Sequence, residues 1–421
     1  MHAHETVESL AAAPFDGAIE RGLKVQRRDF HPTVAMLTYL FPPSFAGGTR
    51  QAIELAKGLR REGVETIFLG ANFLNAPPQE IHEGFQVYRF STWRGPRLQY
   101  LIYALKVCAH LIRRRKEYDL ALLHSTRPFT FIVLRVLKLL NKPALISLTL
   151  IGNDDPASLR KKSFLWKLEA KAMRRFDKII CKSTAIRDIC LKELLPQEKL
   201  AAIPNGTELR RFRPAHDREE VAALRREWSI PESAFVVLFV GRISRRKGCD
   251  VLLHAWELVV QKIPDAWLVL IGPENLAESD AFQNSVREVR AHAAERRVIF
   301  CGEAEHAQVA SFMRLADCFA FPSHREGLPN SVIEAMATGL PVICANIPGV
   351  TSDLIEHQRD GLIFRPRSSY ELAAFILTLK HDSQLRRRLG ENAAKKARAV
   401  FSIDVVAAQH RRLYAEMLQA E

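Results

Sequence analysis

The sequence has no apolar run long enough to cross a membrane and no cysteine pattern typical of a disulfide framework or a zinc site. Its longest apolar stretch, residues 131–151, is interrupted by Arg135, Lys138 and Lys142, whereas a transmembrane helix needs about 20 nearly uncharged residues. The seven cysteines are scattered and include no C-x-x-C pair, so we expect reduced thiols in a cytoplasmic protein. The amino terminus lacks a basic segment followed by an apolar one, which argues against a secretory signal.

Familiar nucleotide- and metal-binding motifs are also missing. No G-x-G-x-x-G follows the first predicted strand, which disfavours a nicotinamide-dependent dehydrogenase. No G-x-x-x-x-G-K-[ST] occurs, so a P-loop is excluded. No D-x-D is present, and the acidic stretch at 153–156 is a poor metal cage. Residues 303–306 could offer ligands, but a turn between a strand and a helix explains them better. We therefore expect neither a metal nor a cofactor.

Acidic residues are scarce relative to basic ones, and the formal net charge is +14. Residues 94–178 hold most of this excess, with 19 basic and 6 acidic residues. Five of the basic residues recur at helical spacing and predict one basic helix face: Arg160, Lys167, Lys171, Arg174 and Lys178. Such a face beside apolar side chains can lie on an anionic membrane surface, although helices that simply cover a domain core show the same pattern. A nucleic-acid-binding protein would need basic residues interleaved with aromatics on a sheet or groove, so we expect no nucleic acid partner.

Apolar runs alternate with helical patterns and predict two successive α/β halves. The run at 32–42 is followed by Gly47 and Gly48, a helical pattern and a second apolar run at 64–70, which is the opening of a doubly wound parallel sheet. The remaining strands are predicted at 119–125, 143–152, 178–183 and 200–206 in the first half and at 234–241, 266–272, 297–302, 317–323 and 340–349 in the second.

This pattern predicts an α/β fold of two doubly wound, Rossmann-like domains that face a central cleft. The expected organisation is a disordered polar extension at 1–30, a first domain at 31–213, a second domain at 214–402 and a final helix at 403–421 that can pack back on the first domain.

Two carboxylates, Glu326 and Glu334, are predicted at the carboxyl edge of the second sheet. Glu326 follows the strand at 317–323, and Glu334 falls in the early turns of the next helix. Taken alone, the two are better explained as a solvated loop residue and a residue that suits the helix dipole. Ligands bind at the carboxyl edge of open α/β sheets, and both sheets would present that edge to one cleft. This convergence favours a binding site.

The loop at 240–248 could hold a diphosphate. Arg242 supplies forked donors and Lys247 a compact charge, a combination that suits two adjoining phosphates, while flanking glycines permit close backbone approach. We expect Arg245 and Arg246 to be solvated. The Gly47–Gly48 turn opens a helix whose free N–H groups also favour an anion.

In their order along the chain, these motifs resemble the retaining, nucleotide-sugar-dependent glycosyltransferases of family 4, which have the two-domain GT-B fold. The resemblance runs from about residue 33 to the carboxyl terminus and includes the Gly47–Gly48 turn, the stretch 203–214, the loop 241–248, Ile271–Gly272 and an E-x7-E signature at Glu326 and Glu334. It implies that the first domain binds the acceptor and the second the nucleotide sugar. The implied donor-binding residues are Gly47, Gly48, Arg242, Lys247, Gly272, Glu326, Gly327, Leu328 and Glu334.

The resemblance also implies roles. Glu326, Arg242 and Lys247 would be catalytic, with Glu326 at the donor sugar and the two cations at the diphosphate, whereas Glu334 would bind the ribose. Many family members carry a histidine where this chain has Ile151, so that histidine's role cannot be transferred. On the acceptor side we name His124 and Asp154.

The implied reaction is transfer of a sugar, with retention and without a metal, to a saccharide or lipid-linked acceptor in cell-surface glycan synthesis. The enzyme would act in the cytoplasm and could lie on the inner face of the membrane through residues 94–178. Another GT-B enzyme, such as a sugar phosphorylase or a nucleotide-sugar epimerase, remains an alternative, and a basic nucleic-acid-binding protein is a weaker one. The sugar, the base, the acceptor, the linkage and the oligomeric state are not specified by the sequence.

Overall fold

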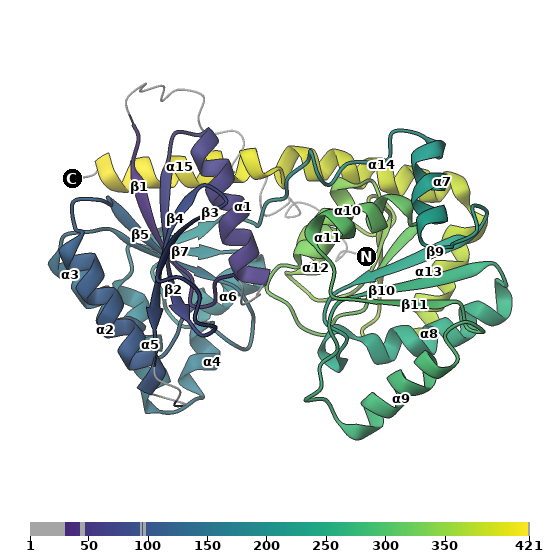
Figure 1. Ribbon diagram of the computed structural model, residues 1–421, viewed down its shortest axis with the longest axis horizontal. Coiled ribbons are helices and arrows are strands. Elements are labelled where there is room, and N and C mark those ends of the chain that lie inside the picture. The colour runs from purple at the N-terminus through teal and green to yellow at the C-terminus, as the bar shows by residue number, and fades with distance from the viewer. Residues whose placement is uncertain (1–29, 43–46, 93–94, 96–97, 420–421) are drawn as a thin grey trace, which may run out of the picture.

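The computed structural model describes residues 30–42, 47–92, 95 and 98–419. The extension predicted at 1–30 lies outside these residues, apart from Phe30. The described chain forms two α/β domains that lie side by side (Figure 1). The predicted α/β class and the pair of doubly wound domains are confirmed.

The N-terminal domain is built on an eight-stranded sheet in the order β3-β4-β2-β1-β5-β6-β7-β8. All neighbouring strands are parallel except β3 and β4, which form an antiparallel hairpin at the edge. The strands are β1 (Thr33–Leu37), β2 (Glu65–Asn72), β3 (Gln79–His82), β4 (Phe85–Ser91), β5 (Leu120–His124), β6 (Ala144–Leu148), β7 (Lys178–Cys181) and β8 (Leu200–Ala202). The order reverses between β1 and β5, which is where a doubly wound sheet opens a crevice for ligands.

Helices cover both faces of this sheet, and the central strands are therefore apolar on both sides. The helices are α1 (Gly47–Arg61), α2 (Leu98–Arg113), α3 (Thr130–Leu139), α4 (Pro156–Arg160), α5 (Phe164–Ala172) and α6 (Thr184–Lys192). Val34 and Met36 of β1 pack with α1, whereas Ala35 and Leu37 pack with α2, α3 and α5 on the opposite face. This alternation is the two-residue period of a strand.

The C-terminal domain has a six-stranded, fully parallel sheet in the order β11-β10-β9-β12-β13-β14. Its strands are β9 (Phe235–Val240), β10 (Ala266–Ile271), β11 (Val298–Gly302), β12 (Cys318–Phe321), β13 (Val342–Ala345) and β14 (Leu362–Phe364). Its helices are α7 (Arg218–Glu227), α8 (Cys249–Lys262), α9 (Asp280–Ala291), α10 (His306–Leu315), α11 (Asn330–Ala337), α12 (Thr351–Leu354), α13 (Ser369–His381) and α14 (Ser383–Val400). The two faces carry separate apolar cores, one under α8, α9 and α13 and the other under α10, α11 and α14.

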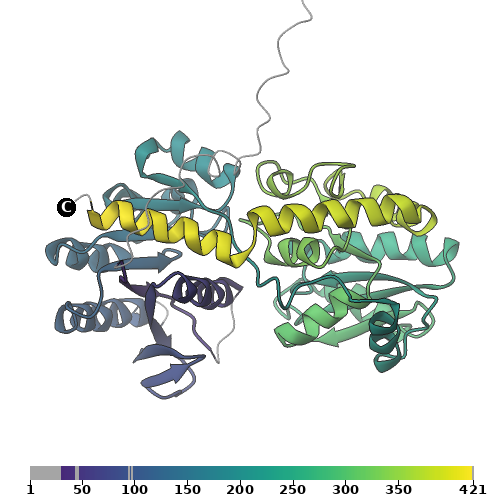
Figure 2. The same cartoon turned by 90° about the horizontal axis from the view of Figure 1, so that it is seen from above.

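The last helix, α15 (Ile403–Gln419), returns to the N-terminal domain. Figure 2 shows α14 and α15 as a yellow band that crosses from one domain to the other. Ile403, Val406 and Ala407 join the apolar cluster beneath α1. The approach of the two helices is close, because a Cβ on Gly58 of α1 would lie 2.9 Å from the Cβ of Ala407. The domains are therefore joined twice, by this helix and by the segment that leads from β8 to α7.

The five basic residues predicted on one helix face do not share a helix. Arg160 ends α4, Lys167 and Lys171 lie on α5, Arg174 lies in the short 3-10 turn η2 (Met173–Arg175) and Lys178 begins β7. Ser163 adopts an extended conformation ahead of α5 and starts a new helix, and Phe176 is extended where the chain turns into β7. The helical period in the sequence runs across these breaks by coincidence, so the predicted face is wrong.

Candidate functional site

A cleft of about 630 Å³ lies between the carboxyl edges of the two sheets. Gly47 and Gly48 at the start of α1 line it from the N-terminal domain, and the loops after β9, β11 and β12 line it from the C-terminal domain. Among the described residues, no atom lies within 4 Å of a Cβ built on either glycine, so these residues leave space beside the amino end of α1. Free N–H groups at such a helix start can receive an anion.

Glu326 lies in the loop after β12, as predicted, and lines the cleft. It is only 7% exposed. Its Oε1 accepts hydrogen bonds from Ser323 Oγ at 2.6 Å and Arg246 Nη1 at 3.1 Å, and it forms an ion pair with Lys247 Nζ at 2.8 Å. Burial of a carboxylate is costly unless cations and donors compensate it. The solvated-loop interpretation of Glu326 is therefore wrong.

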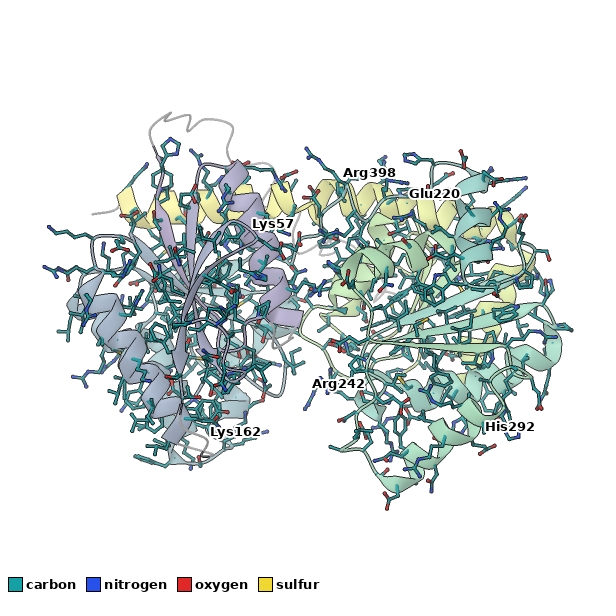
Figure 3. All side chains as sticks on the ribbon, in the orientation of Figure 1. Lys57, Lys162, Glu220, Arg242, His292 and Arg398 are labelled. Carbon is teal, nitrogen blue, oxygen red and sulfur yellow. The ribbon has the colours of Figure 1, made fainter. Side chains whose placement is uncertain are left out.

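The cations reach Glu326 from the loop after β9. Within it, Ser244 caps the short turn η4 (Arg245–Lys247), and Gly248 follows with φ of 71°. A Cβ on Gly248 would collide with the carbonyl of Pro322, so this loop can lie against the β12 loop only with glycine there. Arg242 is exposed at the mouth of the cleft, on the side of the C-terminal domain that faces the N-terminal domain (Figure 3).

Arg246 corrects one sequence expectation. We expected Arg245 and Arg246 to be solvated, and the side chain of Arg245 is indeed exposed. Arg246 instead lines the cleft and donates to the carbonyl of Arg325 at 2.9 Å as well as to Glu326. The tight turn of η4 places neighbouring arginines on different sides, which residue type alone does not reveal.

Glu334 lies in α11, as predicted, and is 6% exposed. Its Oε1 is 2.9 Å from Nε2 of His306, the first residue of α10. Nδ1 of His306 is 2.9 Å from Nη1 of Arg211, which also donates to Glu54 of α1 at 3.2 Å. Because a guanidinium only donates, Nδ1 of His306 must accept a hydrogen bond. Nε2 therefore carries the ring proton and donates a hydrogen bond to Glu334. These contacts link Glu334 in the C-terminal domain to α1 in the N-terminal domain.

Glu54 is the member of this series of contacts that lies in the N-terminal domain, and it is buried. Burial alone would raise the pKa of its carboxyl, but Lys57 and Arg211 outweigh burial and hold the pKa below its ordinary value. His306 was missed as a functional residue from sequence, where its segment was assigned only to a turn between strand and helix. Its one signal was its place directly after the carboxyl end of β11.

Three further glycine and loop positions were implied by the family resemblance. Gly272 lines the cleft with φ of 135°, and a Cβ there would collide with the carbonyl of Gly241. Leu328 also lines the cleft. Gly327 lies where the domains touch, since a Cβ on it would collide with the carbonyl of Thr149.

The two residues named for the acceptor side lie in different surroundings. His124 ends β5 and lines the cleft, and burial lowers the pKa of its imidazole to about 3. Asp154 is buried beneath the loop after β6, where it accepts from the N–H groups of Thr149 and Leu150 and from the Thr149 hydroxyl. The structure thus brings His124 to the cleft but uses Asp154 to shape the loop.

Two other N-terminal residues line the cleft and were not anticipated. Ser147 lies in β6, and Lys182 directly follows β7. Burial lowers the pKa of the Lys182 ammonium to about 7. A charged residue at the carboxyl end of an apolar strand was the only sequence signal, and solvated strand ends often have the same appearance.

Within the described ranges, no group of three or more His, Cys, Asp and Glu side chains could hold a metal ion. No helix of those ranges is long and apolar enough to cross a membrane.

Comparisons with known proteins place both domains. The model of "Glycosyltransferase Family 4" matches residues 45–211, and the model of "Glycosyl transferases group 1" matches residues 220–396. A D-inositol 3-phosphate glycosyltransferase of Corynebacterium glutamicum is 31% identical over 228 residues, 53% of each chain. The chain thus spans about half the length of this curated relative. An Escherichia coli UDP-Gal:alpha-D-GlcNAc-diphosphoundecaprenol alpha-1,3-galactosyltransferase is 26% identical over 324 residues, 74% of this chain and 79% of its own.

Solved structures share the two-domain arrangement. Sucrose-phosphate synthase from Thermosynechococcus elongatus covers 93% of this chain and 100% of its own, with a TM-score of 0.75 and 22% identity. Anabaena HepE in complex with UDP and glucose covers the same shares, with a TM-score of 0.71 and 21% identity. At these identities the likeness shows the fold alone, whereas the two family models together span most of both domains. The chain therefore belongs to the glycosyltransferases of family 4 and has the GT-B fold.

Proposed function

We propose that this protein transfers a sugar from a nucleoside-diphosphate donor to a saccharide or lipid-linked acceptor, with retention at the anomeric carbon and without a metal. The observation that carries the proposal is the joint placement of two buried carboxylates, Glu326 and Glu334, and three cationic side chains in one interdomain cleft. Arg242, Arg246 and Lys247 would neutralise the diphosphate. Glu334, fixed in orientation by His306, would accept hydrogen bonds from the ribose hydroxyls.

The chemistry follows from where charge develops. As the bond between the anomeric carbon and the diphosphate oxygen breaks, negative charge grows on the leaving phosphate, and Arg242 and Lys247 would stabilise that charge. The acceptor oxygen attacks the same face that the leaving group departs from and forms the new glycosidic bond. Its proton passes to an oxygen of the leaving diphosphate, so the products are a glycoside and a protonated nucleoside diphosphate.

Glu326 would position the donor sugar rather than attack it. Its Oε1 already accepts hydrogen bonds from Ser323 and Arg246 and is ion-paired with the Lys247 ammonium. Such donors draw charge from the carboxylate and lower its nucleophilicity, which disfavours a covalent glycosyl-enzyme intermediate.

The N-terminal domain carries a surface that suits an anionic membrane. Leu98, Leu105 and Ile112 recur every seven residues on α2 and are about half exposed, and Phe164 at the start of α5 is 72% exposed. Exposed basic side chains lie on the same helical layer: Lys106, Arg113, Arg135, Lys138, Lys167 and Lys171. Apolar residues ringed by cations are typical of peripheral membrane attachment.

We therefore propose that the enzyme works on the cytoplasmic face of a membrane and builds a cell-surface glycan. The Escherichia coli relative supports this proposal, since its name specifies a diphosphoundecaprenol-linked acceptor. Flotation with liposomes tests the surface. We expect binding to anionic vesicles at low salt, lost at high salt and weakened in a Lys167→Glu/Lys171→Glu variant. The matched control, Arg387→Glu/Arg388→Glu on α14, changes net charge equally and should float normally. Equal loss in both variants, or no flotation, would contradict attachment through this face.

A donor screen tests the proposed reaction. Uridine, guanosine, adenosine and thymidine diphosphate sugars are compared by thermal shift, and a donor that stabilises the protein is then assayed for transfer. We expect one base to dominate and the product anomer to match the donor anomer by NMR. An inverted product would refute retention, and stabilisation by none of the donors would refute the function.

A further inference from the structure

Three polar side chains lie together on the N-terminal wall of the cleft: His124, Ser147 and Lys182. They share one face of the sheet because of the strand register. His124 pairs with Ser147 across β5 and β6, and Ser147 pairs with Ile180 across β6 and β7. Lys182 is two residues beyond Ile180 and so projects from the same face.

The polar atoms of this cluster have few hydrogen-bond partners among the described residues. Among the described residues, neither Nε2 of His124 nor Oγ of Ser147 has a hydrogen-bond partner. Lys182 is only 6% exposed, and the one hydrogen bond of its ammonium to a described residue is to the Pro204 carbonyl at 3.5 Å. Buried polar groups in folded proteins are rarely left unpaired. Two unpaired polar atoms, beside an ammonium that uses only one of its three donors on a described residue, suggest that a ligand completes these hydrogen bonds.

The surroundings determine the sign of that ligand's charge. The titratable groups near Lys182 are His124 on β5, His410 on α15 and Cys181 on β7. Burial lowers the pKa of His124 to about 3 and that of His410 well below its ordinary value, so both imidazoles are neutral at neutral pH. No Asp or Glu in the described part of the chain forms an ion pair with Lys182. The cluster can therefore carry one positive charge, on Lys182, and no described residue supplies the opposite charge.

We infer that Lys182, Ser147 and His124 form a subsite for an anionic group of the acceptor, either a carboxylate or a phosphate. The inference rests on the proposed function, in which the N-terminal domain holds the acceptor. The donor diphosphate has its own cations on the opposite wall, from the loop after β9. An anion at Lys182 would stabilise the protonated amine, and the Ser147 hydroxyl would donate to the same group.

Calorimetry can test the subsite directly. Inorganic phosphate, glucuronate and neutral glucose are titrated into the full-length protein at pH 8, with a saturating nucleoside diphosphate, in two buffers of different ionisation enthalpy. Free Lys182 is mostly neutral at this pH, so binding of either anion should take up roughly one proton per site. Glucose should take up none.

Three variants locate the proton. Lys182→Met should abolish proton uptake and weaken anion binding at least tenfold, whereas Lys182→Arg should keep the affinity without uptake. Lys192→Met, at the exposed end of α6, should behave as the wild type.

Every outcome decides the inference. If the nucleoside diphosphate binds but neither anion does, or if Lys182→Met leaves anion affinity unchanged, the subsite is refuted and the proposed function stands. If the nucleoside diphosphate alone causes uptake that Lys182→Met abolishes, Lys182 serves the donor and the assignment to the acceptor is wrong. If no nucleoside diphosphate binds, the proposed function fails and takes the subsite with it.

Discussion

Lys182→Met should stabilise the protein at neutral and acidic pH, although the change removes a charged residue from the cleft. The ordinary lysine pKa is 10.5, and burial lowers that of Lys182 to about 7. At roughly 1.4 kcal/mol per pKa unit, holding the charged amine in the fold costs on the order of 3–5 kcal/mol below pH 7. Methionine has a similar length and no charge, so it avoids this cost.

The pH dependence gives the sign. Between about pH 7 and pH 10.5 the unfolded chain holds a proton on Lys182 that the folded chain does not, so wild-type stability rises with pH through this window. The advantage of Lys182→Met should therefore be largest below pH 7 and should shrink toward pH 10.5. Other groups titrate equally in both proteins and cancel in the difference.

Urea unfolding of both proteins at pH 6, 7.5, 9 and 10 measures this difference. Lys171→Met, whose side chain is exposed, should show almost no difference from wild type at any of these pH values. An advantage of Lys182→Met that does not change with pH, or a variant less stable than the wild type at pH 6, would refute the reasoning.

Two further predictions concern the C-terminal wall of the cleft. Arg242→Ala or Lys247→Ala should lower kcat/KM by roughly 10²-fold or more, as loss of one charge-stabilising donor does, whereas Arg245→Ala, exposed outside the cleft, should change kcat/KM little. Steady-state kinetics of the wild type with excess EDTA should match kinetics without it. Loss of activity that Mg²⁺ or Mn²⁺ restores would overturn the metal-free proposal. His306→Ala should weaken nucleoside diphosphate binding by roughly tenfold, because Glu334 would lose the donor that orients it; unchanged affinity in calorimetry would show that the contact only connects α10 to α11.

The carboxylates could be placed from sequence because each depends on local pattern. The apolar strand β12, its loop and α11 follow one another within about twenty residues, so Glu326 and Glu334 could be assigned to a loop and a helix. Parallel strands present their carboxyl ends at one edge of a sheet, and from this rule we predicted that both domains line a shared cleft. The edge strands β3 and β14 and the adjoining β4 were not predicted, since they are short or partly polar.

The failures depend on contacts that no local sequence pattern reveals. His306 meets Glu334 only because α10 and α11 pack on the same face of the second sheet. Asp154 was named for the acceptor side from sequence, but its carboxylate accepts hydrogen bonds from backbone N–H groups of its own loop. The pKa of Lys182 is lowered because the side chain is buried beside β5 and α15, and no local sequence pattern reveals that burial.

The central claim is that Glu334 serves the nucleotide and Glu326 serves the transferred sugar. Titration calorimetry with the preferred nucleoside diphosphate, on the wild type, Glu334→Ala and Glu326→Ala, tests it most directly. A hydrogen bond to a charged group contributes about 1.5–3 kcal/mol, so Glu334→Ala should bind roughly 10- to 100-fold more weakly. Glu326→Ala should bind nearly as tightly as the wild type while its turnover falls. The reverse pattern would show that the roles are exchanged, and a wild-type protein that binds no nucleoside diphosphate would contradict the claim itself.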